Sequence, residues 1–278
     1  MRLPQTLLRM KRVLCWGLAA TLSVLVIALV PVQAADSDAG VAKRKYLQGI
    51  KGVDDRVRVD ITQYPWRTIG RLNRDGSYCT GVLIGPSQLL TAAHCFWDHR
   101  RHIWAVPSAF HFVVEYEKGT YGAHTKVKSY RLASGNPSAA NGKAPMEQDW
   151  AIATLEAPLG ETYGYMSLAG SNEDQLKLYR ANGAIFVQAG YSKDISHILT
   201  AHTDCEITGK KNNSKNTGSV LLHRCDATNG DSGSPIFVRQ GDEYKLLGIH
   251  VATFSYKNRE AVGVAVPSDS FRQAVPKY

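Results

Sequence analysis

The sequence is poor in cysteine, in runs of like charge and in long helical periodicity. Only five of its 278 residues are Cys, and none of them has the Cys-x-x-Cys or His/Cys spacing of a zinc site. No metal and no other cofactor is therefore expected. Lys and Arg are scattered without interleaved aromatic residues, so the net charge of +9 indicates a solvated surface and no nucleic-acid partner.

Long apolar runs are missing after residue 34, so nothing in the later sequence is expected to span a membrane. Before that point, four cations in the first twelve residues precede the apolar run Val13–Val30 and the small residues of Val32-Gln33-Ala34. This order predicts a signal peptide over residues 1–34 and a secreted or periplasmic protein. The run borders on the length that spans a bilayer, so an uncleaved anchor is the alternative; after cleavage no stable membrane association is expected.

The exported part has an even number of cysteines. Cys15 lies inside the predicted signal, which leaves Cys79, Cys95, Cys205 and Cys225. Export makes disulfides chemically reasonable, and four cysteines allow three pairings. The two pairs local in sequence, Cys79 with Cys95 and Cys205 with Cys225, are the first proposal among the three.

Short apolar runs punctuated by turns dominate from Val57 onward and predict antiparallel strands, hence an all-β fold. A short C-terminal helix is expected over Ser268–Val275. The expected organisation has five parts: the signal peptide, a pro-segment or loose arm over residues 35–51, a first half over 52–140, a second half over 141–278, and a crossing between the halves within Ser134–Met146.

Three segments could supply the groups that acyl transfer by a serine hydroxyl needs. The strand-like run Leu90-Thr91-Ala92-Ala93-His94-Cys95 ends in a histidine beside a cysteine. Asp149 stands at the start of the apolar strand in Gln148-Asp149-Trp150-Ala151-Ile152-Ala153, where a buried carboxylate would need a partner such as a histidine N–H. Taken singly, each residue has an ordinary explanation: His94 could be a structural histidine, and Asp149 could be an aspartate of a turn before a strand.

The third segment, Gly230-Asp231-Ser232-Gly233-Ser234-Pro235, is the most specific. Glycines on both sides permit a tight turn that projects the Ser232 hydroxyl. In such a turn the N–H groups of Gly230 and Ser232 can converge on one oxygen, as an oxyanion hole requires. A plain Gly/Ser turn explains this segment alone, but not the presence of all three segments in the order His, Asp, Ser.

The three segments together resemble the signature blocks of chymotrypsin-like serine proteases. Asp54-Asp55-Arg56, Tyr64-Pro65-Trp66 and Gly248-Ile249-His250 resemble the bacterial branch that includes the V8-type glutamyl endopeptidases. The resemblance implies two six-stranded β-barrels with the active site between them. It also implies a Ser232 nucleophile, a His94 general base, an orienting Asp149, and protein or peptide substrates.

The resemblance gives two opposed indications about the side-chain pocket. Asp226 aligns with the acid that binds Lys or Arg in trypsin-like enzymes, whereas His250 aligns with the histidine that binds a carboxylate in glutamyl enzymes. The two could also pair with each other, and Asp226 could be a turn residue. In zymogen-type relatives the residue at Asp231 binds a freed N-terminal amine, so processing near Tyr46–Ile50 is a further hypothesis.

Two rival classes remain. A non-catalytic binding protein can keep this fold, although such proteins have usually lost one of the catalytic residues. An esterase of the α/β-hydrolase type would need Gly-x-Ser-x-Gly and the order Ser, Asp, His, which this sequence does not follow.

Overall fold

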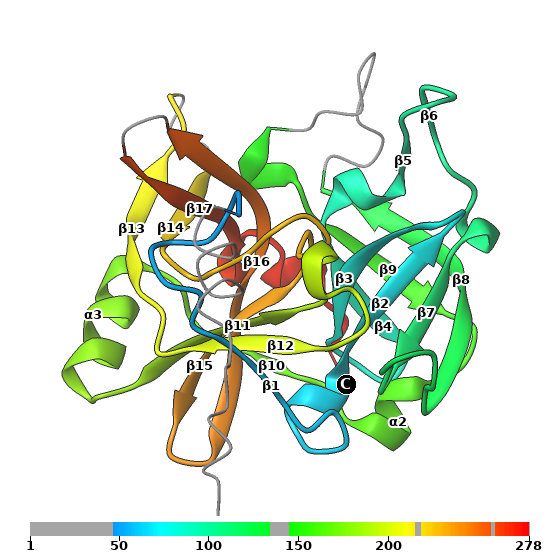
Figure 1. The fold of residues 1–278 in the computed structure, drawn as a ribbon, viewed down its shortest axis with the longest axis horizontal. Helices are drawn as coiled ribbons and strands as arrows, with labels where there is room; N and C mark the ends of the chain where they lie inside the picture. Colours follow the sequence, from blue (N-terminus) through cyan, green and yellow to red (C-terminus); the bar gives the residue numbers. More distant parts are fainter. Residues whose placement is uncertain (1–46, 134–144, 215–217, 257–258, 278) are drawn as a thin grey trace, which may run out of the picture. The chain divides into compact units, whose positions relative to one another are not determined.

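The computed structural model describes residues 47–133, 145–214, 218–256 and 259–277, and it consists mainly of β-strands (Figure 1). The predicted signal, residues 35–46 of the predicted arm and most of the predicted crossing lie outside the described residues. Within the described ranges, no helix has both the length and the apolar character needed to cross a membrane.

The first half is a closed six-stranded barrel with the strand order β2-β3-β4-β9-β8-β7, as the expected fold class has it. Its strand β9 lies beyond residue 140, where the first half was expected to end, and the expected crossing within Ser134–Met146 falls between β8 and β9, two neighbouring strands of this same barrel. A two-stranded hairpin, β5–β6, extends from it. The bounds are β2 Ile69–Arg74, β3 Ser77–Leu83, β4 Gln88–Thr91, β5 Trp97–Asp98, β6 Ile103–Trp104, β7 His111–Val114, β8 Ala123–Leu132 and β9 Ala151–Leu155.

Apolar side chains on the two faces of the barrel strands belong to two different hydrophobic cores. Because successive side chains of a strand point to opposite faces, Leu83 and Leu89 pack with Phe112 inside the barrel. Their neighbours Val82 and Leu90 face the other way and join a cluster that includes residues of the second half. This shared core holds the two halves against each other.

The second half is a nine-stranded sheet with the order β1-β12-β11-β15-β16-β17-β14-β13, to which β10 adds by pairing with β16. It has more strands than the six expected, partly because β1 from the N-terminal segment and the two-residue β10 join it. The bounds are β1 Arg56–Arg58, β10 Ser167–Leu168, β11 Ile185–Gly190, β12 Thr200–Thr203, β13 Ile207–Asn212, β14 Ser219–His223, β15 Pro235–Gln240, β16 Glu243–Tyr256 and β17 Arg259–Pro267.

Helices are short throughout the described part of the chain. The expected C-terminal helix takes the form of two 3-10 turns, Ser268–Ser270 and Arg272–Ala274. Helix α2 spans Leu159–Tyr163, and the longer α3 spans Glu173–Ala181.

Helix α3 was not expected from the sequence, although it carries a capping signal. The Asn172 side chain accepts a hydrogen bond from the Gln175 N–H at 2.9 Å, as an N-cap does. Leu176 is buried, but Leu178 is 54% exposed. The apolar stripe is therefore too narrow to produce clear helical periodicity.

Candidate active site

Strand pairing brings His94 and Asp149 together. Thr91 at the end of β4 lies opposite Ala151 at the start of β9. His94 follows β4 within the 3-10 turn η2 (Ala93–Phe96), and Asp149 precedes β9. Both residues therefore lie at the same end of the barrel, although 55 positions separate them in the sequence.

Asp149 holds His94 through two hydrogen bonds. The backbone N–H of His94 donates to Asp149 Oδ1 at 2.9 Å, and His94 Nδ1 lies 2.7 Å from Asp149 Oδ2. A carboxylate at this distance requires the imidazole proton on Nδ1, which leaves Nε2 as an acceptor. Burial opposes charge on His94, but the Asp149 carboxylate outweighs it and raises the pKa of the imidazole above its ordinary value.

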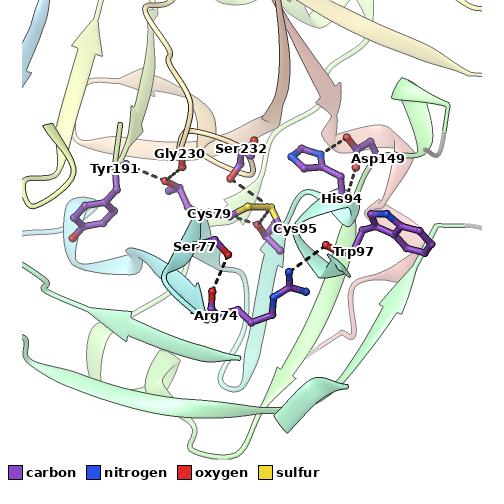
Figure 2. The surroundings of a disulfide bond; sticks show 12 residues. Arg74, Ser77, Cys79, His94, Cys95, Trp97, Asp149, Tyr191, Gly230 and Ser232 are labelled. Atoms are coloured by element: carbon purple, nitrogen blue, oxygen red, sulfur yellow. Dashed lines mark hydrogen bonds and ion pairs between the residues drawn. A yellow bond between two sulfur atoms is a disulfide. The ribbon is translucent and has the colours of Figure 1, made fainter. Parts of the chain in front are cut away.

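Ser232 reaches the same place from the second half. Its carbonyl accepts a hydrogen bond from the Thr80 N–H of β3 at 2.9 Å, and Thr80 Oγ1 donates to the Gly230 carbonyl at 3.0 Å. In Figure 2 the imidazole of His94 is drawn between Ser232 and Asp149. Ser232 and His94 also line one cavity of about 420 Å³.

The backbone angles and the close packing of the turn around Ser232 require glycine at positions 230 and 233. Gly230 and Gly233 have φ values of +95° and +82°, in the left-handed region that favours glycine. A Cβ on Gly233 would lie 2.1 Å from Thr91 Oγ1, and one on Gly230 would lie 2.4 Å from the Tyr191 carbonyl. The turn can pack against β3 and β4 only with glycine at these positions.

The backbone N–H groups of Gly230 and Ser232 differ from those of the residues that follow. Neither donates a hydrogen bond to another residue in the described part of the chain. The next N–H groups along the chain are bonded: Gly233 donates to the His250 carbonyl at 2.7 Å, and Ser234 donates to the Asp231 carbonyl at 2.8 Å. The loop is thus fixed by its neighbours while its two expected oxyanion donors stay free.

Both expected disulfides are present and lie beside these segments. Cys79–Cys95 joins β3 to η2, the turn that carries His94. Cys205–Cys225 joins the segment before β13 to the segment that leads to Ser232.

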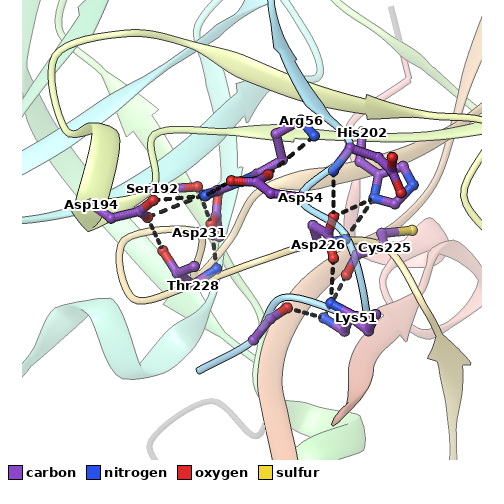
Figure 3. Close-up of polar contacts among 12 residues, drawn as sticks. Lys51, Asp54, Arg56, Ser192, Asp194, His202, Cys225, Asp226, Thr228 and Asp231 are labelled. Carbon is purple, nitrogen blue, oxygen red and sulfur yellow. Dashed lines mark hydrogen bonds and ion pairs between the residues drawn. The ribbon is translucent and has the colours of Figure 1, made fainter. Parts of the chain in front are cut away.

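Asp231 already has partners within the protein. Its Oδ2 accepts hydrogen bonds from Ser192 Oγ at 2.6 Å and from the Thr228 N–H at 2.7 Å. Burial raises the pKa of Asp231 to about 6. Oδ2 of Asp231 is thus satisfied by neighbouring residues without a freed N-terminal amine, and Figure 3 shows these contacts beside the Arg56–Asp194 ion pair of 2.7 Å.

A second cavity, of about 120 Å³, also adjoins Ser232 and contains His250. It is lined by Gln48, Ala227, Thr228, Asn229, Ser232, His250, Val251, Ala252 and Thr253. His250 is buried, and its Nε2 lies 3.4 Å from Thr253 Oγ1. Burial is the main cause that lowers the pKa of His250 to about 3.

Asp226 does not line this cavity. It is fully buried, and its carboxylate accepts hydrogen bonds from the Lys51 N–H at 2.6 Å and the Asp55 N–H at 3.1 Å. His202 Nδ1 lies 3.2 Å from Oδ2 and accepts a hydrogen bond from the Asp226 backbone N–H at 2.9 Å. Burial alone would raise the pKa of Asp226, but the hydrogen bonds to its carboxylate lower it, so Asp226 is an internal anion held by neighbouring donors and does not pair with His250.

Sequence reasoning missed His223, the actual partner of His250. Its Nε2 lies 3.0 Å from His250 Nδ1, and its Nδ1 accepts a hydrogen bond from the Cys225 N–H at 3.2 Å. The two histidines are 27 positions apart in the sequence. No spacing motif connects them, and only the β14–β17–β16 strand order brings them together.

Two groups of described side chains are close enough to share a cation. One is Cys79, His94 and Cys95; the other is Asp55, His202 and Asp226. The sulfurs of the first form a disulfide. In the second, backbone N–H groups already occupy the Asp226 oxygens, so neither group is a free set of metal ligands.

Comparisons with known proteins show which family the chain belongs to. The family model described as Trypsin matches residues 55–275. Glutamyl endopeptidase of Bacillus licheniformis is 30% identical over 211 residues, covering 74% of this chain and 60% of that protein. Serine protease 23 of Rattus norvegicus is 25% identical over 240 residues, covering 77% and 58%.

The chain thus spans about three fifths of the length of these relatives. Among solved structures, a Glu endopeptidase in complex with MPD has a TM-score of 0.62 at 20% identity, covering 81% of this chain and 98% of that one. The thermostable serine protease AL20 has a TM-score of 0.55 at 16% identity, covering 74% and 94%. At these identities the solved structures show the shared fold alone.

The family match extends over most of the chain and includes all three segments that carry His94, Asp149 and Ser232. The chain therefore belongs to the trypsin family and, within it, resembles the V8-type glutamyl endopeptidases.

Proposed function

We propose that the protein is an extracytoplasmic serine endopeptidase that cleaves after acidic side chains. One observation carries the catalytic part of the proposal: Asp149 fixes the tautomer of His94, and His94 lines the same cavity as Ser232. Two disulfides support the extracytoplasmic location, because such bonds persist in oxidising compartments.

The proposed mechanism follows from the proton positions. Ser232 Oγ attacks the scissile carbonyl carbon while its proton passes to His94 Nε2, and Asp149 stabilises the resulting imidazolium. The N–H groups of Gly230 and Ser232 receive the developing oxyanion. His94 then gives the proton to the leaving amine, and water hydrolyses the acyl-enzyme by the same sequence of steps.

The two cavities indicate how a substrate lies. His94 must reach the leaving amine, and it lines the larger cavity but not the smaller one. The leaving side of the substrate therefore belongs in the larger cavity. The side chain before the scissile bond belongs in the smaller cavity, beside His250.

Hydrogen-bond directions make His250 a donor toward that side chain. Cys225 N–H donates to His223 Nδ1, so neutral His223 carries its proton on Nε2 and donates to His250 Nδ1. Neutral His250 then carries its proton on Nε2, the atom nearest Thr253 Oγ1. Burial lowers the pKa of both imidazoles, which supports the neutral forms.

This donor supports binding of a carboxylate in the smaller cavity. No carboxylate lines that cavity among the described residues, and Asp226 is held by internal donors, so a Lys or Arg side chain would find no partner there. The similarity to a relative named glutamyl endopeptidase points the same way.

Short peptides that differ only in the residue before the scissile bond test this specificity. Glu should give a kcat/KM about 10- to 100-fold above Gln, because a hydrogen bond to a charged acceptor contributes about 1.5–3 kcal/mol. Arg and Phe should be poorer still. A higher kcat/KM for Arg than for Glu would show that the assignment of the pocket is wrong.

The pH profile tests the role of His94 separately. His94 must be neutral to accept the Ser232 proton, so kcat/KM should fall about tenfold for each pH unit below its raised pKa. A substrate with Gln before the scissile bond avoids titration of the substrate itself. Activity that stays constant down to pH 4 would contradict His94 as the base.

A further inference from the structure

Lys51 is a buried cation next to the segment that forms the specificity pocket. Its residue is 8% exposed, and its ammonium donates to the carbonyls of Gly49 at 2.7 Å and Cys225 at 2.5 Å. Figure 3 shows it below Asp226, to which its backbone N–H is bonded. Gln48, three residues before it, lines the pocket.

Hydrogen bonds place this ammonium close behind the two histidines of the pocket. Lys51 Nζ donates to the Cys225 carbonyl, the Cys225 N–H donates to His223 Nδ1, and His223 Nε2 donates to His250 Nδ1. The Cys225 carbonyl and the Cys225 N–H belong to two different peptide groups, so the ammonium acts on the histidines through space. From the Cys225 N–H onward, each donor points toward the next group, and this polarity favours a negative charge beside His250 Nε2.

The charge on Lys51 also acts directly on the two histidines. After burial, which is the main cause, Lys51 is one of the charged groups that lower the pKa of His223 and of His250. The same field that disfavours a proton on these imidazoles favours an anion beside them. The carboxylates of Asp226 and Asp231 act on Lys51, but neither is among the groups that shift the pKa of His250.

We propose that Lys51 is a specificity-determining residue: its ammonium, held behind His223 and His250, supplies the positive charge that makes an acidic side chain preferred over its neutral amide. This inference rests on the proposed function of the pocket. Lys51 does not line the pocket itself, so it acts through the histidine pair and through its field.

The alternative is that Lys51 only anchors the N-terminal segment. An anchor would affect the folded fraction and all substrates alike. A charge behind the pocket would raise kcat/KM for the peptide with Glu before the scissile bond and leave kcat/KM for the Gln peptide nearly unchanged. The ratio of kcat/KM for Glu to kcat/KM for Gln separates the two roles, because the concentration of folded enzyme cancels in it.

The test compares K51M with K177M, which removes an exposed lysine of α3 as a matched loss of charge. In K51M the Glu/Gln ratio should fall about tenfold, as expected when one buried unit charge is removed from behind the pocket. In K51M, kcat/KM for the Gln peptide should stay within about twofold of the parent value. K177M should keep the parent Glu/Gln ratio. A parent ratio in folded K51M would overturn the inference while leaving the proposed function intact.

The unmodified protein provides a second test that does not depend on the folding of a variant. Burial lowers the pKa of Lys51 to about 8. Lys51 is charged below that pH and neutral above it, so the Glu/Gln ratio should fall as the pH rises through about 8. In K51M the ratio should not change over this range.

Other titratable or charged groups face Lys51 from the surrounding elements, and they must be considered. They are Arg56 on β1, His202 on β12, His223 on β14, His250 on β16, and Asp226 and Asp231 before Ser232. The tested range is pH 7 to 10. The pKa values of Asp226, His223 and His250 are lowered and lie below this range. The pKa of Asp231, about 6, also lies below it. A ratio that stays constant from pH 7 to 10 would reject the role of Lys51, whereas failure to cleave either peptide would reject the proposed function itself.

Discussion

Replacing Ser232 with alanine should lower kcat about a millionfold while leaving the fold intact. Loss of the nucleophile in a Ser-His-Asp triad removes nearly all covalent catalysis. The hydroxyl makes no hydrogen bond to another described residue, and the loop is held through backbone atoms, including the Ser232 carbonyl bonded to Thr80. The thermal midpoint should therefore match that of the parent. The measurement is hydrolysis of a peptide with Glu before the scissile bond.

A matched control is S129A, which removes an exposed serine of β8 and should keep the parent rate. Stoichiometric labelling by an organophosphate should occur in the parent and in S129A, but not in S232A. Cleavage by S232A at the parent rate would falsify the assignment of the nucleophile. An unlabelled, inactive parent protein would instead favour the non-catalytic binding protein.

Replacing Asp149 with asparagine should lower kcat/KM about 10,000-fold. The asparagine oxygen can still accept the His94 backbone N–H, which places its NH2 group against His94 Nδ1. That nitrogen must then accept a hydrogen bond, so the imidazole proton moves to Nε2 and faces Ser232. In this tautomer His94 cannot take the proton of the serine.

The imidazole itself can be monitored in this variant. Asp149 raises the pKa of His94 against the effect of burial, so D149N should titrate at a lower pH when followed by NMR. D174N, which removes an exposed carboxylate on α3, should change neither the rate nor the titration. If D149N retains activity within about tenfold of the parent, Asp149 does not orient the base.

Local sequence was sufficient where the chemistry depends on adjacent residues. The Gly230–Pro235 segment predicted a tight turn because its glycines are needed for backbone angles and close packing, and both requirements are found. Alternating apolar residues predicted strands such as β3 and β4, whose opposite faces line two cores. Helix α3 was missed because its apolar stripe is too narrow.

The sequence could not decide the contents of the specificity pocket. The resemblance left Asp226 and His250 both open as pocket residues, with His250 favoured, and a pair between them was a third option. In the structure the Asp226 carboxylate accepts hydrogen bonds from the backbone N–H groups of Lys51 and Asp55, and His250 pairs with His223. These partners come from strands and segments far apart in the chain, and no local pattern records which of them meet.

The sequence by itself determined the family, the all-β character and the three segments proposed for catalysis, because each depends on residue types at fixed short spacing. Only the tertiary structure decided that Asp226 is internal, that Asp231 is already bonded, and that Lys51 lies behind the histidine pair. A hydrogen-bond partner is chosen by strand register and burial, which are set by contacts throughout the whole chain. The charge balance of the pocket is therefore a property of the folded protein.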